Sequence, residues 1–130
     1  MSEASENLLN QLVELEKSAS KFGFEWPNQQ AIIEQAISEC EEIREAIEND
    51  EPEHRVQEEI GDLLHTAVSL CRFSGFDLEQ TLTQVVIKFG SRMEALKAVA
   101  KEKGLDSLEG QSTKFMLELW DEVKKREKNN

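Results

Sequence analysis

Tyrosine, turn-forming residues and long apolar runs are scarce in this chain. Its 130 residues include no Tyr, two Pro and six Gly. A chain with so few turn formers is poorly suited to a loop-rich or all-β architecture. No stretch approaches the roughly 20 apolar residues of a membrane span, and the polar first ten residues do not resemble a signal peptide. These absences predict an all-α, cytoplasmic protein with no membrane partner.

Positive charge is also in short supply. Fifteen Lys and Arg stand against 27 Asp and Glu, which gives a formal net charge of -12. The resulting field repels nucleic acid and anionic membranes, so we expect no nucleic-acid partner. A small polyanion such as a nucleotide can still bind where a metal ion and a few cations reverse the local potential.

Cysteine is limited to two positions, Cys40 and Cys71. Each falls on the apolar face of a predicted helix. We therefore expect both to be small buried hydrophobic residues and expect no disulfide.

Apolar residues at helical spacing predict a bundle of four or five helices. The predicted helices span about residues 6–22, 28–49, 52–73, 77–103 and 112–125. Asn28 and Asp77 are suitable N-caps, and Pro52 suits the first turn of a helix. We expect one domain over residues 1–130, with residues 1–5 and 126–130 flexible.

Two neighbouring helices carry paired acids beside their apolar stripes. The stripe of the second helix is predicted to be Ile32, Ile33, Ala36, Ile37, Cys40, Ile43 and Ile47, and that of the third Val56, Ile60, Leu63, Leu64, Ala67, Val68 and Cys71. At about 100° per residue, Glu39 and Glu42 border the first stripe. Glu59 and Asp62 flank the second, and the short connection between the helices predicts an antiparallel pair in which the acids face one another.

Converging carboxylates repel one another unless a divalent cation neutralises them, and Mg²⁺ prefers carboxylate oxygens. Other acid pairs with the same spacing occur in this Glu-rich chain, and charge runs are usually solvated. Spacing alone therefore leaves both a magnesium site and a solvated surface open. Glu41, Glu45 and Glu48 lie on the opposite side of their helix and are predicted to be solvated. Gly61 costs about 1 kcal/mol relative to Ala in a helix interior, which suggests close approach of a helix, a ligand or a metal.

The acid motifs resemble those of a known family. The run Glu39-Cys-Glu-Glu42, followed after sixteen residues by Glu59-Ile-Gly-Asp62, is similar to the signature of MazG-like nucleoside triphosphate pyrophosphohydrolases, an all-α group. The segments Phe-Glu-Trp-Pro at 24–27, Lys-Phe-Gly-Ser-Arg at 88–92 and Leu-Trp-Asp-Glu-Val-Lys at 119–124 also fit. Ser38 departs from the family, which often has a Glu there, and Ser91 stands where an arginine is common.

The resemblance implies Mg²⁺-dependent hydrolysis of an NTP or dNTP between the α and β phosphates, with Mn²⁺ as a possible replacement. It implies that Glu39, Glu42, Glu59 and Asp62 are metal-binding and catalytic residues, with Glu39 or Glu42 as the general base. It also implies a homodimer or homotetramer that removes unwanted nucleotides from the cellular pool.

Residues outside the paired acids allow more than one interpretation. Lys88 and Arg92 lie four residues apart, so they share a helix face and could bind phosphate, or form an ordinary surface pair with a neighbouring Glu. The aromatic residues Phe22, Phe24 and Trp26 could contact a nucleobase or plug the core. His65 points away from the predicted stripe, which favours a surface or subunit interface over a metal site.

Two other functions compete with nucleotide hydrolysis. Carboxylate-bridged di-iron bundles use Glu-x-x-His on two helices, whereas this chain has Asp62-x-x-His65 once and no equivalent at His54. A non-enzymatic helical interaction module would treat the acids as solvated surface.

Overall fold

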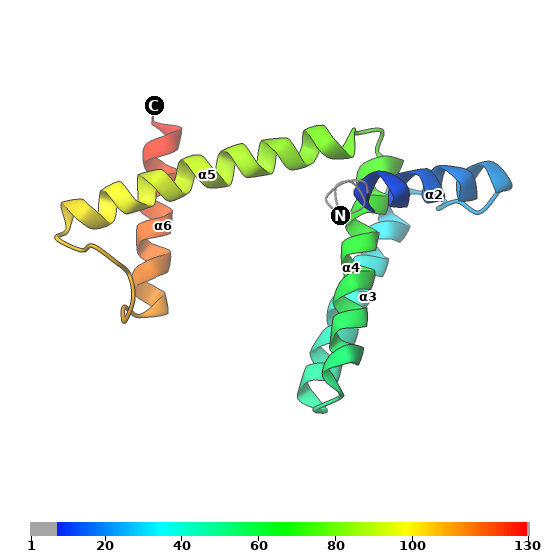
Figure 1. Ribbon diagram of the computed structural model, residues 1–130, viewed down its shortest axis with the longest axis horizontal. Helices are drawn as coiled ribbons and strands as arrows, with labels where there is room; N and C mark the ends of the chain where they lie inside the picture. Colours follow the sequence, from blue (N-terminus) through cyan, green and yellow to red (C-terminus); the bar gives the residue numbers. More distant parts are fainter. Residues whose placement is uncertain (1–7, 130) are drawn as a thin grey trace. The chain divides into compact units, whose positions relative to one another are not determined.

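The computed structural model describes residues 8–129, most of which lie in five α-helices (Figure 1). These are α2 (Leu8–Phe22), α3 (Gln29–Glu48), α4 (Glu53–Phe73), α5 (Leu78–Glu102) and α6 (Thr113–Lys128). No strand occurs among residues 8–129, so the predicted all-α class is confirmed. The predicted start of the first helix and the predicted flexible segment 1–5 lie outside the described residues. At the other end, α6 continues through residue 128.

Local side chains determine where several helices begin. The Asn28 side chain accepts a hydrogen bond from the Ala31 backbone N–H at the start of α3. Asp77 Oδ2 accepts one from the Gln80 backbone N–H at 2.9 Å beside the start of α5. Pro52 is the N-cap of α4. These positions confirm the predicted helix starts, because each satisfies or removes a donor that a helix N-terminus leaves unpaired.

A tight turn joins α3 to α4 and places the two helices side by side in antiparallel orientation (Figure 1). Asp50 adopts a positive φ of 50°. The backbone N–H of Asp50 bonds to the Ile47 carbonyl and that of Glu51 to the Ala46 carbonyl, at 3.2 and 3.0 Å. This pattern is the Schellman motif, which ends a helix by satisfying its last carbonyls. The short turn sets the register that brings residues near 40 opposite residues near 60.

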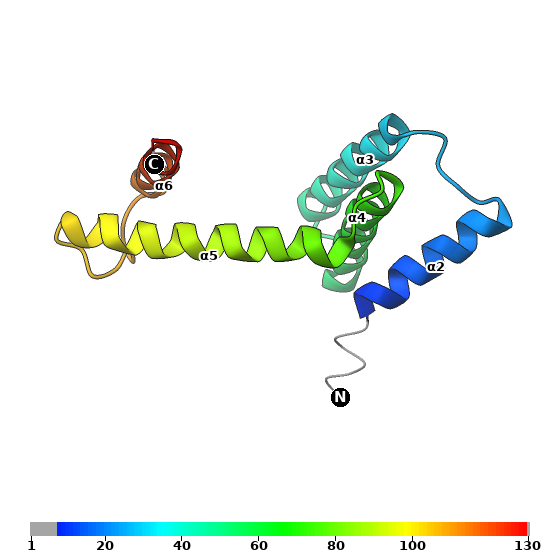
Figure 2. The same cartoon turned by 90° about the horizontal axis from the view of Figure 1, so that it is seen from above.

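The chain forms two compact units, the first ending at Thr81 and the second beginning at Leu82. In the first unit, α4 contacts both α3 and α2, and Figure 2 shows α4 beside α3. Its buried residues are both apolar and polar: Ile32, Glu39, Ala46, Thr66, Val68 and Ser69. None of the described helices combines the length and apolar character needed to cross a membrane.

The predicted apolar stripes are only partly buried. Ile32 has no exposed surface, as expected, but the predicted burial of Ile33, Ile37 and Ile47 is wrong, since these side chains are exposed. Cys40 is also exposed, which corrects the prediction of a buried thiol, and Cys71 is half-buried. On α4, the exposed positions of the predicted stripe are Ile60, Leu64 and Ala67.

The predicted stripe of α3 is only partly buried because one neighbouring helix covers only a narrow strip of it. Residues 32, 39 and 46 are seven apart and lie on a single line along the helix, and all three are buried. The exposed residues Ile33, Ile37 and Ile47 lie off this line. Gly61 has no neighbouring heavy atom within 4 Å of the position a Cβ would occupy, so the suggested close approach of another helix of this chain is wrong.

The second unit buries a small core where α5 and α6 meet. Val99, Leu119 and Val123 are each 2% exposed, and Leu96, Leu108 and Phe115 pack against them. Nearby, the rings of Phe89 and Trp120 lie with centroids 6.2 Å apart.

Candidate metal centre and ligand pocket

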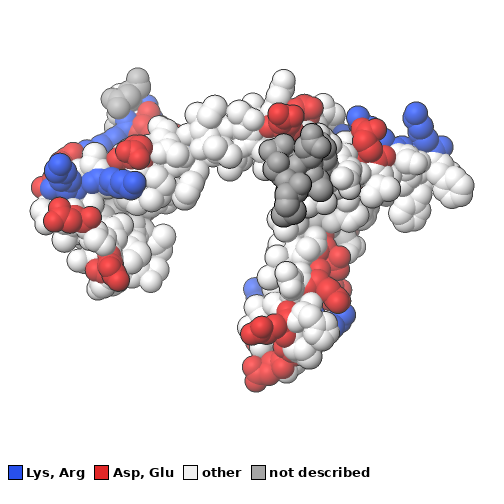
Figure 3. Space-filling model, viewed as in Figure 1, with Lys and Arg blue, Asp and Glu red and all other residues white. Residues whose placement is uncertain are grey.

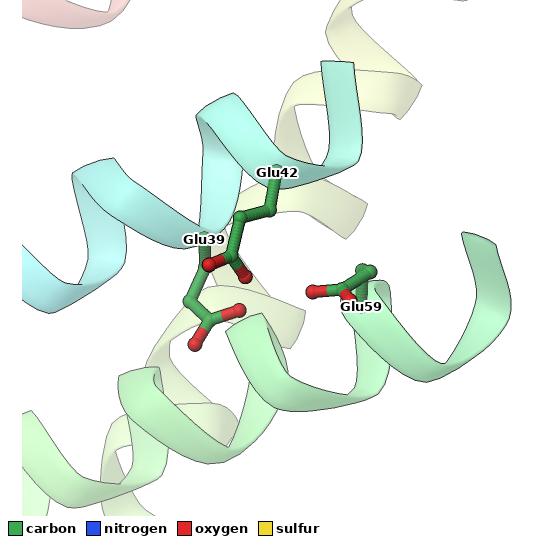
Figure 4. A group of neighbouring side chains, drawn as sticks. All are labelled: Glu39, Glu42 and Glu59. Atoms are coloured by element: carbon green, nitrogen blue, oxygen red, sulfur yellow. The ribbon is translucent and has the colours of Figure 1, made fainter. Parts of the chain in front are cut away.

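Three of the four predicted acids converge between α3 and α4. Glu39 and Glu42 project from α3 toward Glu59 on α4 (Figure 4). One carboxylate oxygen of each lies within 4.8 Å of the corresponding oxygens of the other two. The antiparallel hairpin therefore brings together residues that are up to twenty positions apart in the sequence.

Burial makes this acid cluster (Glu39, Glu42 and Glu59) different from a solvated surface. Glu39 is only 7% exposed, and Glu59 is half-buried. The Oε2 atoms of both residues are buried and have no hydrogen-bond partner. Buried carboxylate oxygens are nearly always paired, because leaving one unpaired costs about 1–3 kcal/mol or more. The two buried, unpaired oxygens therefore fit a cluster that can hold a cation.

The acid cluster also carries an excess of negative charge. The pKa of Glu42 is raised, chiefly by a hydrogen bond to the Glu59 carboxyl and further by the negative charges of Glu39 and Glu59. Arg55 pairs with one member of the cluster: its Nη2 atom is 3.5 Å from Glu59 Oε1, and it also pairs with Glu51 and Glu58. One shared arginine leaves the three acids with an excess of negative charge. Figure 3 shows acidic side chains over the same hairpin.

Asp62 is not part of this group of three. It lies on α4 one turn after Glu59, its side chain is exposed, and its backbone carbonyl accepts a hydrogen bond from Thr66 Oγ1 at 2.9 Å. Glu41, Glu45 and Glu48 are exposed on the other side of α3, which confirms their predicted solvation.

The donor set fits a hard divalent cation. Three carboxylates, two with buried unpaired oxygens, match the preference of Mg²⁺ and Mn²⁺ for oxygen ligands. Among the described residues, no histidine joins the group, whereas a di-iron bundle uses histidine from two helices. The arrangement therefore suits magnesium-type chemistry better than a di-iron site.

A separate pocket of about 470 Å³ lies within the first unit, between α2, the segment after it and α4. Phe24, Trp26 and Pro27 form part of its wall, together with Leu12, Leu15 and Ala19 of α2. Its polar side consists of Glu16, Glu25, His65, Ser69 and Arg72. An apolar wall with a few polar groups at one side is typical of a small-molecule site.

Arg72 ties the pocket together. Its Nε atom donates to Glu16 Oε1 at 2.6 Å, and its Nη1 and Nη2 atoms donate to the two Glu25 oxygens at 3.1 and 2.9 Å. The hydrogen bonds from Arg72 are the largest cause of a Glu25 pKa of about 2, against an ordinary 4.5. Ser69 Oγ also donates to Glu16. The network fixes α2 and the aromatic segment on α4.

The predicted aromatic and histidine residues are placed differently. Phe24 and Trp26 line the pocket, whereas Phe22 is 91% exposed and does not. His65 lines the pocket too, and its Nε2 atom is 2.7 Å from Glu16 Oε2. The His65 side chain is 52% exposed, which matches the predicted surface position.

Lys88 and Arg92 lie on the part of α5 in the second unit. Arg92 forms two hydrogen bonds to Glu127, at 2.9 and 3.1 Å, and its Cζ atom is 6.0 Å from the Trp120 ring centroid. Lys88 is exposed. The pairing of Arg92 with Glu127 matches the second role predicted for these residues, an ordinary surface ion pair.

Some candidate residues were missed at the sequence level. Gln35 donates from Nε2 to Glu39 Oε1 at 2.7 Å, and its spacing of four residues from Glu39 is a helix-face signal that could have revealed it. Glu16 and Arg72 are 56 residues apart, and no local pattern predicts such a contact.

Comparisons with known proteins show which family the sequence matches. The family model described as the MazG nucleotide pyrophosphohydrolase domain matches residues 28–97, a span that contains all four predicted acids. The chain is 31% identical over 110 residues to "Nucleoside triphosphate pyrophosphohydrolase/pyrophosphatase MazG" of Thermotoga maritima, covering 85% of this chain and 41% of that protein.

Other relatives are similar over part of their length. "Nucleoside triphosphate pyrophosphohydrolase" of Escherichia coli K12 is 28% identical over 114 residues, which is 87% of this chain and 43% of that protein. "Uncharacterized protein YabN" of Bacillus subtilis is 35% identical over 78 residues, 60% of this chain and 16% of that protein. The chain thus spans less than half the length of these curated relatives.

The structure places the chain in the class of all-α proteins that carry a carboxylate cluster between two antiparallel helices. The match to more than half of the chain then shows the family: this chain belongs to the MazG nucleotide pyrophosphohydrolase domain family.

Proposed function

We propose that the chain hydrolyses a nucleoside triphosphate, NTP or dNTP, between the α and β phosphates to give the monophosphate and pyrophosphate. The observation that carries the proposal is the acid cluster, in which buried oxygens of Glu39 and Glu59 have no partner. Family membership supports the same reaction. The role that follows is removal of unwanted nucleotides from the cellular pool, in the cytoplasm.

The proposed cofactor is Mg²⁺, which Mn²⁺ could replace. Glu39, Glu42 and Glu59 would hold it, because their oxygens already lie within 4.8 Å of one another. We propose Asp62 as the fourth ligand, on its match to the family motif and its place one turn after Glu59. When bound, the metal offsets the charge of the acids and the triphosphate and polarises the phosphate oxygens.

The protein's own groups then position and deprotonate the attacking water. Glu39 or Glu42 takes a proton from the water as its oxygen bonds to phosphorus. The bond from the attacked phosphorus to the oxygen that bridges the α and β phosphates breaks. This separates the monophosphate from pyrophosphate. We propose that Lys88 and Arg92 bind phosphate oxygens and stabilise the departing group. Arg92 would exchange its contact with Glu127 for one with phosphate.

The pocket beside α2 is the proposed place for the base. Phe24 and Trp26 offer aromatic surface for stacking, and their place in a pocket of about 470 Å³ supports this role. Phe22, proposed with them from the sequence, lies outside the pocket wall and has less support.

The whole chain is proposed to work as one domain in a homodimer or homotetramer. Support comes from exposed apolar side chains on α3 and α4, namely Ile33, Ile37, Ile47, Ile60 and Leu64. Apolar patches of this kind commonly mark protein interfaces, and a second copy of the chain would cover them. The partners are thus a small nucleotide and another copy, without nucleic acid or membrane.

A direct assay tests the function. The purified protein is incubated with Mg²⁺ and a panel of NTPs and dNTPs, and both the monophosphate and pyrophosphate are quantified. We expect release of pyrophosphate from at least one nucleotide, and loss of release in Asp62→Asn. The matched control is Glu45→Gln on the solvated side of α3, which should retain wild-type activity. Absence of turnover with every nucleotide would contradict the proposed function. Full activity in Asp62→Asn would contradict the proposed role of Asp62 as a metal ligand.

A further inference from the structure

Gln35 lies one helical turn before Glu39 on α3, and its side chain is directed at the acid cluster. Its Nε2 atom donates a 2.7 Å hydrogen bond to Glu39 Oε1, and the contact is partly buried. The contact joins two side chains of the same helix face and places an amide donor beside the acid cluster.

The hydrogen bond gives the two oxygens of Glu39 different roles. Oε1 is occupied by Gln35, whereas Oε2 is buried and has no partner. With the residue only 7% exposed, water has little access to either oxygen. An amide N–H can only donate, so Gln35 stabilises the orientation of the charged carboxylate without competing for a cation.

We propose that Gln35 is a positioning residue for the metal centre: it holds Glu39 Oε1 so that Oε2 faces the cation shared with Glu42 and Glu59. The inference rests on the proposed function, because it assumes that the acid cluster binds a metal. Hydrogen bonds that orient metal-ligating carboxylates typically contribute 10- to 100-fold in metal affinity. Without Gln35, the Glu39 carboxylate would be free to rotate away from its two neighbours.

The test replaces Gln35 with Met, which has a similar shape but no donor. The matched control is Gln30→Met, an exposed position on the same helix. Binding of Mn²⁺ to the nucleotide-free protein is measured by isothermal titration calorimetry. We expect Gln35→Met to weaken Mn²⁺ binding by roughly 10-fold or more, and Gln30→Met to bind like the wild type.

Catalysis provides a second readout that a general loss of structure would not imitate. In Gln35→Met, the Mg²⁺ concentration for half-maximal activity should rise, and saturating Mg²⁺ should restore most of kcat. A loss of kcat that saturating metal does not restore would contradict a positioning role. Equal Mn²⁺ affinity in the wild type and Gln35→Met would overturn the inference.

An NMR titration keeps the test decisive even where Gln35→Met does not fold. In the wild-type protein, the side-chain amide signals of Gln35 should shift when Mg²⁺ is added, and those of Gln30 should not. An unshifted Gln35 amide at saturating Mg²⁺ would overturn the inference. Failure of the proposed function is distinguishable, because then the wild type itself would neither bind Mn²⁺ nor release pyrophosphate.

Discussion

The acid cluster of the first compact unit and the ion pairs of the second differ in how their charges are compensated. In the first, Glu39, Glu42 and Glu59 gather between α3 and α4, and two of their buried oxygens remain unpaired. In the second, charges are matched within the unit: Arg92 binds Glu127, and Arg126 binds Glu102 and Glu122. Uncompensated charge of one sign can be neutralised by an external cation, whereas a compensated pair needs none. This difference distinguishes the candidate metal centre from ordinary surface ion pairs.

The largest expected effect comes from Glu59→Gln, which removes charge from the uncompensated cluster. We expect pyrophosphate release to fall by at least about 100-fold, because a metal ligand and its electrostatic contribution are lost. The same change should raise the Tm of the metal-free protein, since it relieves repulsion among the three acids.

Thermal unfolding with and without Mg²⁺ checks the second part of this prediction. Added Mg²⁺ should stabilise the wild type and leave Glu59→Gln nearly unchanged, because only a ligand that binds the folded state raises stability. A metal-free Tm that falls in the variant would argue that Glu59 has a structural role instead.

A smaller effect is expected where charge is compensated. If Arg92 binds phosphate, Arg92→Met should raise KM by about 10-fold, the value of a charge-assisted hydrogen bond. Glu127→Gln should lower KM by a smaller factor, because an exposed ion pair holds the Arg92 guanidinium only weakly. Steady-state kinetics measures both changes.

Arg126→Met is the matched control for this pair of variants. It also breaks ion pairs to glutamates on the surface of the second unit, yet it should leave KM unchanged. An equal rise in KM in Arg126→Met and Arg92→Met would show that the effect is not specific to Arg92.

The smallest effect concerns stability near the pocket. The pKa of Glu25 is about 2 in the folded protein, against an ordinary 4.5. A lowered pKa stabilises the folded state above about pH 4.5, and this contribution is lost as the pH falls toward 2. Glu25→Gln should therefore lower the Tm by roughly a few degrees at pH 7. The difference should shrink between pH 4.5 and 2, which differential scanning calorimetry can follow. A difference that does not depend on pH would exclude the ionic origin.

Local patterns predicted the elements of the fold well. Asn28 and Asp77 cap helices as expected, because capping depends on residues three positions apart. The sequence also predicted the antiparallel hairpin, because a short connection forces two consecutive helices to pack side by side in opposite directions. Its register brought Glu39, Glu42 and Glu59 together as the spacing suggested.

Burial and long-range contacts were harder to predict. Periodicity marks an apolar face but not how much of it a neighbour covers, so Ile37 and Cys40 were expected inside and lie outside. The pocket depends on Arg72 reaching Glu16 and Glu25 from α4, and these pairs are 56 and 47 residues apart. Such pairs form only when the helices pack, so no local signal predicts them.

The central claim is that a divalent metal binds the acid cluster between α3 and α4. Anomalous diffraction from crystals of the protein grown with Mn²⁺ tests it most directly. The account predicts a manganese peak within coordination distance of the Glu39, Glu42 and Glu59 carboxylates, with Gln35 still bonded to Glu39. A well-ordered cluster without such a peak, or a manganese ion bound elsewhere alone, would contradict it.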